Sequence, residues 1–271
     1  MQKFVAEFKL NPQPGTFNFR NIFGTHDRSD AVYNAPRVWY GHQMFNGNTA
    51  NNDDPESMDL PFIMHADSLI SLADVKRYLS SHYNSTEFDP IGTGPVQLKK
   101  KYRPISLAKT QESHVLQMRP NQHNIHWLSM GVSAQSIYIP IFAETKDVPR
   151  AYKTGGQVYS SLSAYWIFKL TGVLVDAHLK DFIPLLEDTH KRLDISFGKQ
   201  IKNIDHHISD VKNDKVAEFL TDQTKKMSLE ALSAFRELNA VMITKSTDMS
   251  LLNFNTDENL GSSSRSTDRK F

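Results

Sequence analysis

Polar and charged side chains enter a segment that otherwise has the composition of a β-strand. Glu112 and His114 stand two positions apart there, and Arg103 lies a few residues upstream. Polar groups near a buried strand cost about 1 to 3 kcal/mol each unless they are paired. We therefore expect Glu112 and His114 either to point into a cleft or to satisfy each other, and simple structural pairing is the plainer interpretation for each residue.

The eleven histidines invite a search for a metal site. The densest sets are Asp205-His206-His207 and the pair His123 and His126. Adjacent residues of a helix point about 100° apart, so His206 and His207 cannot chelate one ion together. No two histidines stand at the i, i+4 spacing of the helical zinc motif H-E-x-x-H. We expect no metal site and no cofactor, and we assign these histidines to solvated surface.

Two common nucleophiles of hydrolases are absent. The chain has no cysteine, which excludes a thiol nucleophile, a disulfide and a thiolate zinc site within it. It also has no Gly-x-Ser-x-Gly segment, the nucleophile elbow of the α/β serine hydrolases. The absence of cysteine fits a reducing compartment, and we expect a cytoplasmic location.

The charge balance argues against polyanionic partners. Thirty-one Lys and Arg face thirty Asp and Glu, which leaves a net charge of +1. The basic run from Lys99 to Arg103 is expected to be a solvated surface. The most apolar later stretch, residues 164–179, is interrupted by Lys169 and Asp176 and is too short to span a bilayer. We expect a soluble protein that binds neither nucleic acid nor a membrane.

Three short segments rich in β-branched and aromatic residues predict an antiparallel meander. The near-continuous apolar run Ile137–Phe142 indicates a strand buried on both faces. Pro140 within it requires an edge position or a bulge. A sheet covered on both faces needs more layers than three strands supply. The strands are expected at residues 113–118, 125–130 and 136–142, within a sheet region around residues 105–143.

Short helices and polar loops are predicted before the sheet. Ser71 offers an N-cap, and Asp74 offers the carboxylate of a capping box. Pro36 suits the first turn of another helix. The asparagine-rich segment Asn46–Pro55 has the composition of a surface loop. The expected helices cover residues 1–10, 17–24, 31–45 and 71–79, with a second loop at residues 88–95.

The remainder of the chain is predicted to be helical beyond Tyr159. Apolar residues recur every three or four positions from Leu193 to Val211, and again from Val216 to Met242. Asn213-Asp214 between them has the chemistry of an N-cap. Two long helices are therefore expected to pack as an antiparallel hairpin, followed by a disordered polar tail.

Four motifs, in order, resemble one family. They are Tyr33–Trp39, the segment from Arg103 to His114, His126–Gly131 and Ser136–Pro140. Together they resemble the C-terminal part of the cysteine N-terminal-nucleophile dipeptidases, peptidase family C69, of the dipeptidase A or D type. The resemblance covers residues 17–152, and the helical remainder agrees in kind.

The resemblance implies a fold and a reaction. The fold would be the C-terminal part of an αββα sandwich, and the reaction would be hydrolysis of dipeptides by the thiol of a mature N-terminal cysteine, with its own α-amino group as base. No position of this chain matches that cysteine. We expect the nucleophile segment to precede residue 1, to be a partner of this chain, and to be required for activity.

The resemblance also suggests roles for three residues. Arg103 is the candidate for a fixed positive charge that stabilises the thiolate and the oxyanion; equally, it is a surface member of the basic run. Glu112 is a candidate partner for the free amine of a dipeptide substrate. His114 is expected at the substrate end of the site or just behind it.

The expected organisation has three parts. Residues 1–152 form an incomplete α+β portion of the N-terminal-nucleophile type, residues 153–252 a helical portion packed on it, and residues 253–271 a disordered tail. A fragment of this kind should form a homo-oligomer or depend on the missing segment. Two alternatives stay open: a non-catalytic interaction module, in which helices within residues 179–245 bind a partner helix, and an amide hydrolase of the penicillin V acylase or bile-salt hydrolase type.

Overall fold

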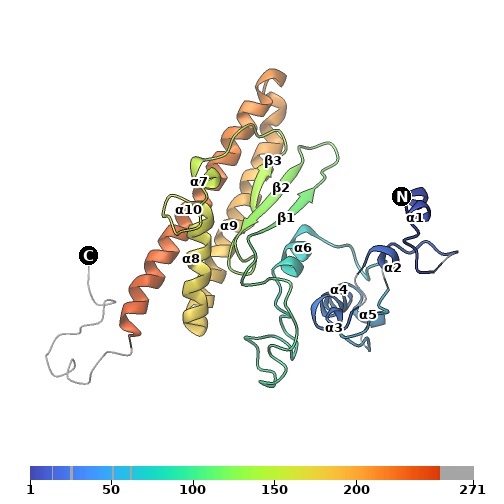
Figure 1. The fold of residues 1–271 in the computed structure, drawn as a ribbon. Helices are drawn as coiled ribbons and strands as arrows, with labels where there is room; N and C mark the ends of the chain where they lie inside the picture. Colours follow the sequence, from blue (N-terminus) through green and yellow to red (C-terminus); the bar gives the residue numbers. More distant parts are fainter. Residues whose placement is uncertain (14, 25–26, 51, 62, 251–271) are drawn as a thin grey trace, which may run out of the picture. The chain divides into compact units, whose positions relative to one another are not determined.

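The chain combines helices with a three-stranded antiparallel sheet and a long helical region, which confirms the α+β class. It forms two compact units, Met1–Leu107 and the residues from Ala108 onward, and each is described by itself. The computed structural model (Figure 1) describes residues 1–13, 15–24, 27–50, 52–61 and 63–250.

The contacts between residues place the boundary between the two parts of the chain at a different position from the one that composition predicts. The two units meet between residues 107 and 108, whereas the sequence analysis divides the chain at residue 152. The predicted portions 1–152 and 153–252 therefore stay predictions. The predicted disordered tail, residues 253–271, lies outside the described residues.

Six helices are described in the first unit, and they follow the predicted pattern with two differences. The expected helix at residues 31–45 is two helices that meet at Asn34, and Pro36 lies in the first turn of the second. The predicted loop Asn46–Pro55 was wrong for its first part, because the Asn46 carbonyl accepts the amides of Thr49 and Ala50 and closes a helical turn. The helices are α1 (Gln2–Glu7), α2 (Phe19–Phe23), α3 (Asp30–Tyr33), α4 (Ala35–Phe45), α5 (Gly47–Ala50) and α6 (Leu72–Leu79).

The predicted capping box begins α6. The Ser71 hydroxyl accepts the backbone amide of Asp74 at 3.2 Å, and the Asp74 carboxylate accepts the backbone amide of Ser71 at 2.9 Å. Two of the amides that a helix start leaves without partners are thus satisfied by the pair. The sequence rule therefore located the beginning of α6 correctly.

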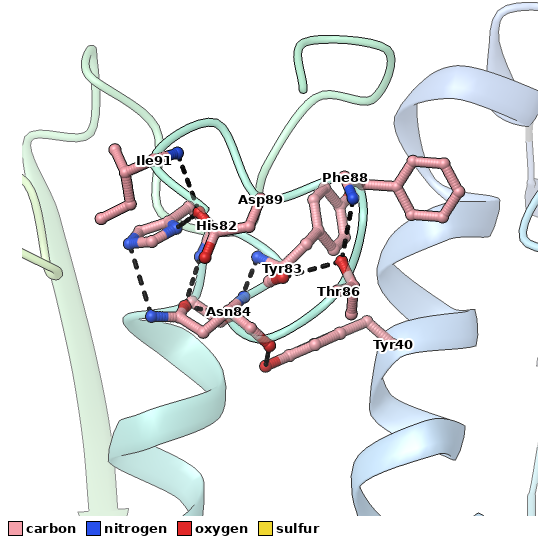
Figure 2. A network of polar contacts seen from close by, with 9 residues as sticks. Tyr40, His82, Tyr83, Asn84, Thr86, Phe88, Asp89 and Ile91 are labelled. Atoms are coloured by element: carbon pink, nitrogen blue, oxygen red, sulfur yellow. Dashed lines mark hydrogen bonds and ion pairs between the residues drawn. The ribbon is translucent and has the colours of Figure 1, made fainter. Parts of the chain in front are cut away.

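The loop after α6 is held by its own polar side chains (Figure 2). Tyr83 has a φ of +68°, and the Thr86 hydroxyl donates to its carbonyl at 2.8 Å. The Asp89 carboxylate contacts Nδ1 of His82 at 2.9 Å and accepts the amide of Ile91 at 3.0 Å. These bonds fix the loop against the aromatic core of the first unit, which consists of Tyr40, Tyr83, Phe88 and Tyr102.

The second unit contains the sheet that the sequence predicts. Strands β1 (Glu112–Gln117), β2 (Ile125–Met130) and β3 (Ile139–Phe142) pair antiparallel in the order β1-β2-β3, which confirms the meander. Pro140 lies on β3, an edge strand of this sheet as described, so the expectation of an edge position is confirmed.

The two faces of the sheet have different surroundings. Ile125, Trp127 and Ser129 on β2 are buried, whereas the alternate residues of β2 are partly exposed. Helices α8 (Ala164–Ala177) and α10 (Val216–Asp248) contact β2 and β3 (Figure 1). One face is therefore packed on helices. We call the other, partly exposed face the open face.

The predicted helical hairpin is confirmed. Helix α9 (Leu179–His207) packs against α10, and α10 also packs against α8 (Figure 1). The predicted seam is buried at Leu193, Phe197, Ile201 and Ile204 of α9 and at Leu232, Phe235, Leu238 and Met242 of α10.

Three details of this hairpin were wrong. Leu229, predicted in the seam, is 53% exposed, because the buried stripe of α10 runs through Met227, Ser228 and Ala231 instead. Helix α9 ends at His207, short of Val211. The predicted N-cap is instead part of a 3-10 turn, Asn213–Lys215, and α10 begins after Lys215 without a side-chain cap.

No helix among the described residues is long and apolar enough to cross a membrane. The two short helical elements not yet mentioned are α7 (Arg150–Lys153) and a 3-10 turn at Ile208–Asp210 that follows α9.

A buried polar pair joins α8 to α10 and allows a test of their packing. The Thr171 hydroxyl donates to Oδ1 of Asn239 at 2.6 Å, and Nδ2 of Asn239 donates to the Ile167 carbonyl at 3.0 Å. Asn239→Ala should lower the free energy of unfolding by about 1–3 kcal/mol, because it leaves buried groups unsatisfied. Urea denaturation measures this change in the free energy of unfolding. Glu237→Ala, on the exposed side of α10, should change it by less than about 0.5 kcal/mol; equal effects would contradict the role of Asn239.

A second test concerns His190 on α9. Its Nε2 atom is buried without a hydrogen-bond partner among the described residues, its ring lies 6.0 Å from that of Phe235, and burial lowers its pKa to about 4. The unfolded chain takes up this proton near pH 6.5 and the folded chain only near pH 4. The contribution of His190 to the free energy of unfolding is therefore complete above pH 6.5. It decreases by up to about 3 kcal/mol as the pH falls from 6.5 to 4. The free energy of unfolding, measured by urea denaturation, should differ less between pH 7 and pH 5 in His190→Leu than in the unsubstituted chain. An equal difference in both proteins would contradict this role of His190.

Candidate functional site

The open face of the sheet gathers one acidic and two imidazole side chains. Glu112 and His114 occupy alternate positions of β1 and so share a face. His126 of β2 pairs directly with Leu116, which makes it a diagonal neighbour of His114 on that same face. We call Glu112, His114 and His126 the open-face cluster.

The three side chains of the cluster lie close together. Nδ1 of His114 is 2.6 Å from Oε1 of Glu112, and each of these side chains is 49% exposed. The rings of His114 and His126 meet edge to face with centroids 5.3 Å apart. Potential ligand atoms of all three residues lie within 4.8 Å of one another. Of the two alternatives predicted for Glu112 and His114, the structure shows mutual pairing, with half of each side chain still open to solvent.

His126 is the least exposed member. Its Nε2 atom is buried and has no hydrogen-bond partner among the described residues. Burial lowers the pKa of His126, and the neighbouring His114 lowers it further, while Glu112 acts in the opposite direction. Burial and the neighbouring His114 both favour the neutral ring, in which one of the two nitrogens can accept a proton or bind an ion.

Arg103, the predicted thiolate partner, lies in the first unit. Its backbone is fixed, because its amide donates to the Val32 carbonyl at 3.1 Å and its carbonyl accepts the Tyr83 hydroxyl at 2.7 Å. Its side chain is exposed, with the guanidinium carbon 5.3 Å from the centre of the Tyr33 ring. No carboxylate pairs with it in the described part of the chain, whereas Lys101 of the same basic run pairs with Glu56 at 2.6 Å.

Sequence reasoning overlooked a second arginine of this unit. Arg37 lies in the first turns of α4, and its Nε donates to the Arg103 carbonyl at 3.4 Å. Its Nη2 atom is buried without a partner among the described residues. Burial lowers the pKa of Arg37 and the Arg103 charge does the same, while the Tyr83 hydroxyl favours the charged form. A partly buried guanidinium without a carboxylate has capacity left for an anion.

The candidates fall into two groups by unit. Arg37 and Arg103 belong to the first unit, and the open-face cluster belongs to the second, so each group is described within its own unit. The first group offers positive charge, and the second offers a carboxylate and two imidazoles. The sequence signal for Arg37 was its place in the motif Tyr33–Trp39; its burial could not be inferred from spacing.

Comparison with known proteins agrees with the resemblance stated above. The model of peptidase family C69 matches residues 1–192. The chain belongs to peptidase family C69. All five candidate residues lie within the matched residues, whereas α10 lies beyond them.

Curated relatives of this C69 chain are dipeptidases. It is 36% identical over 264 residues to a probable dipeptidase of Latilactobacillus sakei, which covers 96% of this chain and 55% of the relative. It is 32% identical over 252 residues to probable dipeptidase B of Lactococcus lactis, covering 90% and 52%. Dipeptidase A of Lactobacillus helveticus is 30% identical over 234 residues, covering 84% and 48%. The chain thus spans about half the length of these relatives and matches their C-terminal part.

The unpaired charge of Arg37 leads to a stability test. Arg37→Met removes a partly buried cation for which the described residues supply no carboxylate partner, so it should leave the free energy of unfolding unchanged or raise it by up to about 2 kcal/mol. The matched control is Arg119→Met, because Arg119 is paired with Asp205 and both are largely buried.

The control should behave in the opposite way. Removing Arg119 leaves Asp205 without its partner and should lower the free energy of unfolding by about 3 kcal/mol. Urea denaturation, followed for the unit that carries each change, measures both. A large loss of stability in Arg37→Met would contradict the expectation for this variant, because it would mean that the hydrogen bond from Arg37 to the Arg103 carbonyl outweighs the cost of burying the charge.

Proposed function

We propose that this chain is the C-terminal part of a cysteine-type N-terminal-nucleophile dipeptidase whose attacking thiol lies in a segment outside the chain. The observation that carries the proposal is the C69 family match over residues 1–192, in a chain without any cysteine. The printed names of the relatives favour dipeptides as substrates over the amides of penicillin V acylases and bile-salt hydrolases. A cysteine-free chain is compatible with a cytoplasmic location, which belongs to the same proposal.

The proposed reaction proceeds in two steps. The thiol of the N-terminal cysteine attacks the peptide carbonyl while its own α-amino group takes the thiol proton. The α-ammonium group then gives this proton to the leaving amine as the C–N bond breaks, which leaves an acyl-enzyme. Water then releases the second amino acid and restores the thiol. In this scheme Arg103 supplies fixed positive charge to the thiolate and the oxyanion.

The two ends of a dipeptide require opposite charges. Glu112 is the proposed partner of the free ammonium group, and its hydrogen bond to His114 holds the carboxylate in place. This role extends the expectation that Glu112 and His114 lie at the substrate end of the site or just behind it.

The proposed αββα sandwich is supported by the exposed residues of the open face. Leu116 of β1 is 66% exposed, and Met118, just past the strand, is 75% exposed. Apolar side chains on an unpacked sheet face favour a further layer of protein. The half of the relatives that this chain does not match is the proposed source of that layer.

The deciding experiment supplies the missing half. Hydrolysis of an unblocked dipeptide is measured for this chain alone and for the chain joined to the unmatched N-terminal half of the Latilactobacillus sakei relative. The control replaces every cysteine of the added half by alanine. We expect activity only in the joined protein with its cysteines intact.

Other outcomes would contradict the proposal. Activity of the chain alone would exclude a thiol mechanism, because the chain has no cysteine. An inactive but folded joined protein would favour the non-catalytic interaction module. Activity on penicillin V or a bile-salt amide, with none on dipeptides, would favour the acylase branch.

The role of Glu112 has its own test in the joined protein. Glu112→Gln removes the charge opposite the substrate ammonium, so KM for a free dipeptide should rise about 10-fold or more with kcat nearly unchanged. An N-acetylated dipeptide, if cleaved, should be insensitive to the change. The matched control is Glu144→Gln, because Glu144 is bound to His123 at 2.7 Å in a similar pair. An equal rise of KM in both variants would exclude a specific role for Glu112.

A further inference from the structure

We propose that Glu112, His114 and His126 form a binding site for Zn²⁺ or a chemically similar transition-metal ion on the open face of the sheet. This site is independent of the dipeptidase proposal, because its ligands all belong to this chain and its occupancy can be measured without any activity. It also departs from the expectation of no metal, which rested on the spacing of histidines along the sequence.

The ligand atoms are already close to the required geometry. Potential ligand atoms of the three residues lie within 4.8 Å of one another. Zinc bonds to nitrogen and oxygen of about 2.0–2.2 Å place neighbouring ligand atoms about 3.3 Å apart in a tetrahedral site. Side-chain rotations that bring the atoms together by about 1.5 Å or less therefore complete the site, and two of the side chains are half exposed, which leaves room for such rotations.

His126 provides an independent observation. Its Nε2 atom is buried and has no hydrogen-bond partner among the described residues, which is uncommon for a buried polar atom. This nitrogen lies in the residue whose ring meets that of His114 edge to face. An ion coordinated by this nitrogen would satisfy it.

The backbone holds the three ligands in fixed relative positions. Glu112 and His114 are separated by one residue of β1, and the register His114↔Leu128 and Leu116↔His126 places His126 diagonally across the strand pair. Leu116 and Leu128 flank the histidines on the same face. Ligands on paired strands are better preorganised than ligands on loops.

The donor set determines the class of ion. Two imidazoles and one carboxylate suit Zn²⁺, Co²⁺ and Ni²⁺, whereas Mg²⁺ and Ca²⁺ prefer oxygen ligands alone. Three protein ligands leave one tetrahedral position for water. The site is thus expected to discriminate against the abundant alkaline-earth ions.

Calorimetric titration of the metal-free chain with ZnCl₂ tests the proposal. We expect one equivalent of Zn²⁺ to bind, and Glu112→Gln, His114→Gln and His126→Gln each to weaken it at least about tenfold. Titration with MgCl₂ should show no binding to this site. The matched control is His123→Gln, which removes a partly exposed histidine bound to a glutamate but outside the cluster, and should leave the affinity unchanged.

A second measurement avoids substitutions altogether. Co²⁺ added to the unsubstituted chain should broaden the ring NMR signals of His114 and His126 before those of His123, His206 and His207. Absence of zinc binding, an affinity unchanged in all three cluster variants, or first broadening at another histidine would overturn the proposal. Circular dichroism melting checks that each variant is folded. If a variant is not folded, the Co²⁺ measurement on the unsubstituted chain decides whether the proposal holds.

Discussion

The packing of α8 and α10 on one face of the sheet determines which strand residues are left for chemistry. Helix α10 contacts β3 and α8 contacts β2, and Ile125, Trp127 and Ser129 are buried as a result. Because side chains alternate along a strand, burial of these residues directs their neighbours to the opposite face. The open-face cluster exists only as a consequence of this one-sided packing, and a slip of β1 by one residue would turn Glu112 and His114 toward the helices.

Local patterns in the sequence predicted the elements, but not the contacts between them. The capping box at Ser71 and the edge position of Pro140 follow from rules that act within a few residues, and both were correct. His126 was not grouped with His114, because their proximity depends on the strand register, which joins residues twelve positions apart. Spacing along a helix does not reveal a metal-ligand cluster that forms across two strands.

The same limit explains the two arginines. Arg103 was chosen from a motif, and the structure fixes its backbone while its side chain stays exposed over Tyr33. Arg37 lies in a helix that Pro36 predicts, but no local pattern shows that its Nη2 atom is buried and has no partner in the described part of the chain. Burial is a property of the packed unit, and an unpaired partly buried cation is recognised only when its surroundings are known.

Glu112 takes part in both proposals, and its two roles exclude each other in any one molecule. A carboxylate that coordinates a divalent ion has lost most of its attraction for a substrate ammonium, because the ion neutralises it. A bound transition-metal ion would thus act against a dipeptide at the same position, and its removal by a chelator would free the carboxylate. His126 separates the two roles in physical terms: the ion requires a ring nitrogen of His126, whereas the ammonium requires only the negative charge of Glu112 held by His114. A substitution at His126 therefore acts on the metal alone, which makes this residue the point at which binding of the ion and binding of the substrate can be resolved.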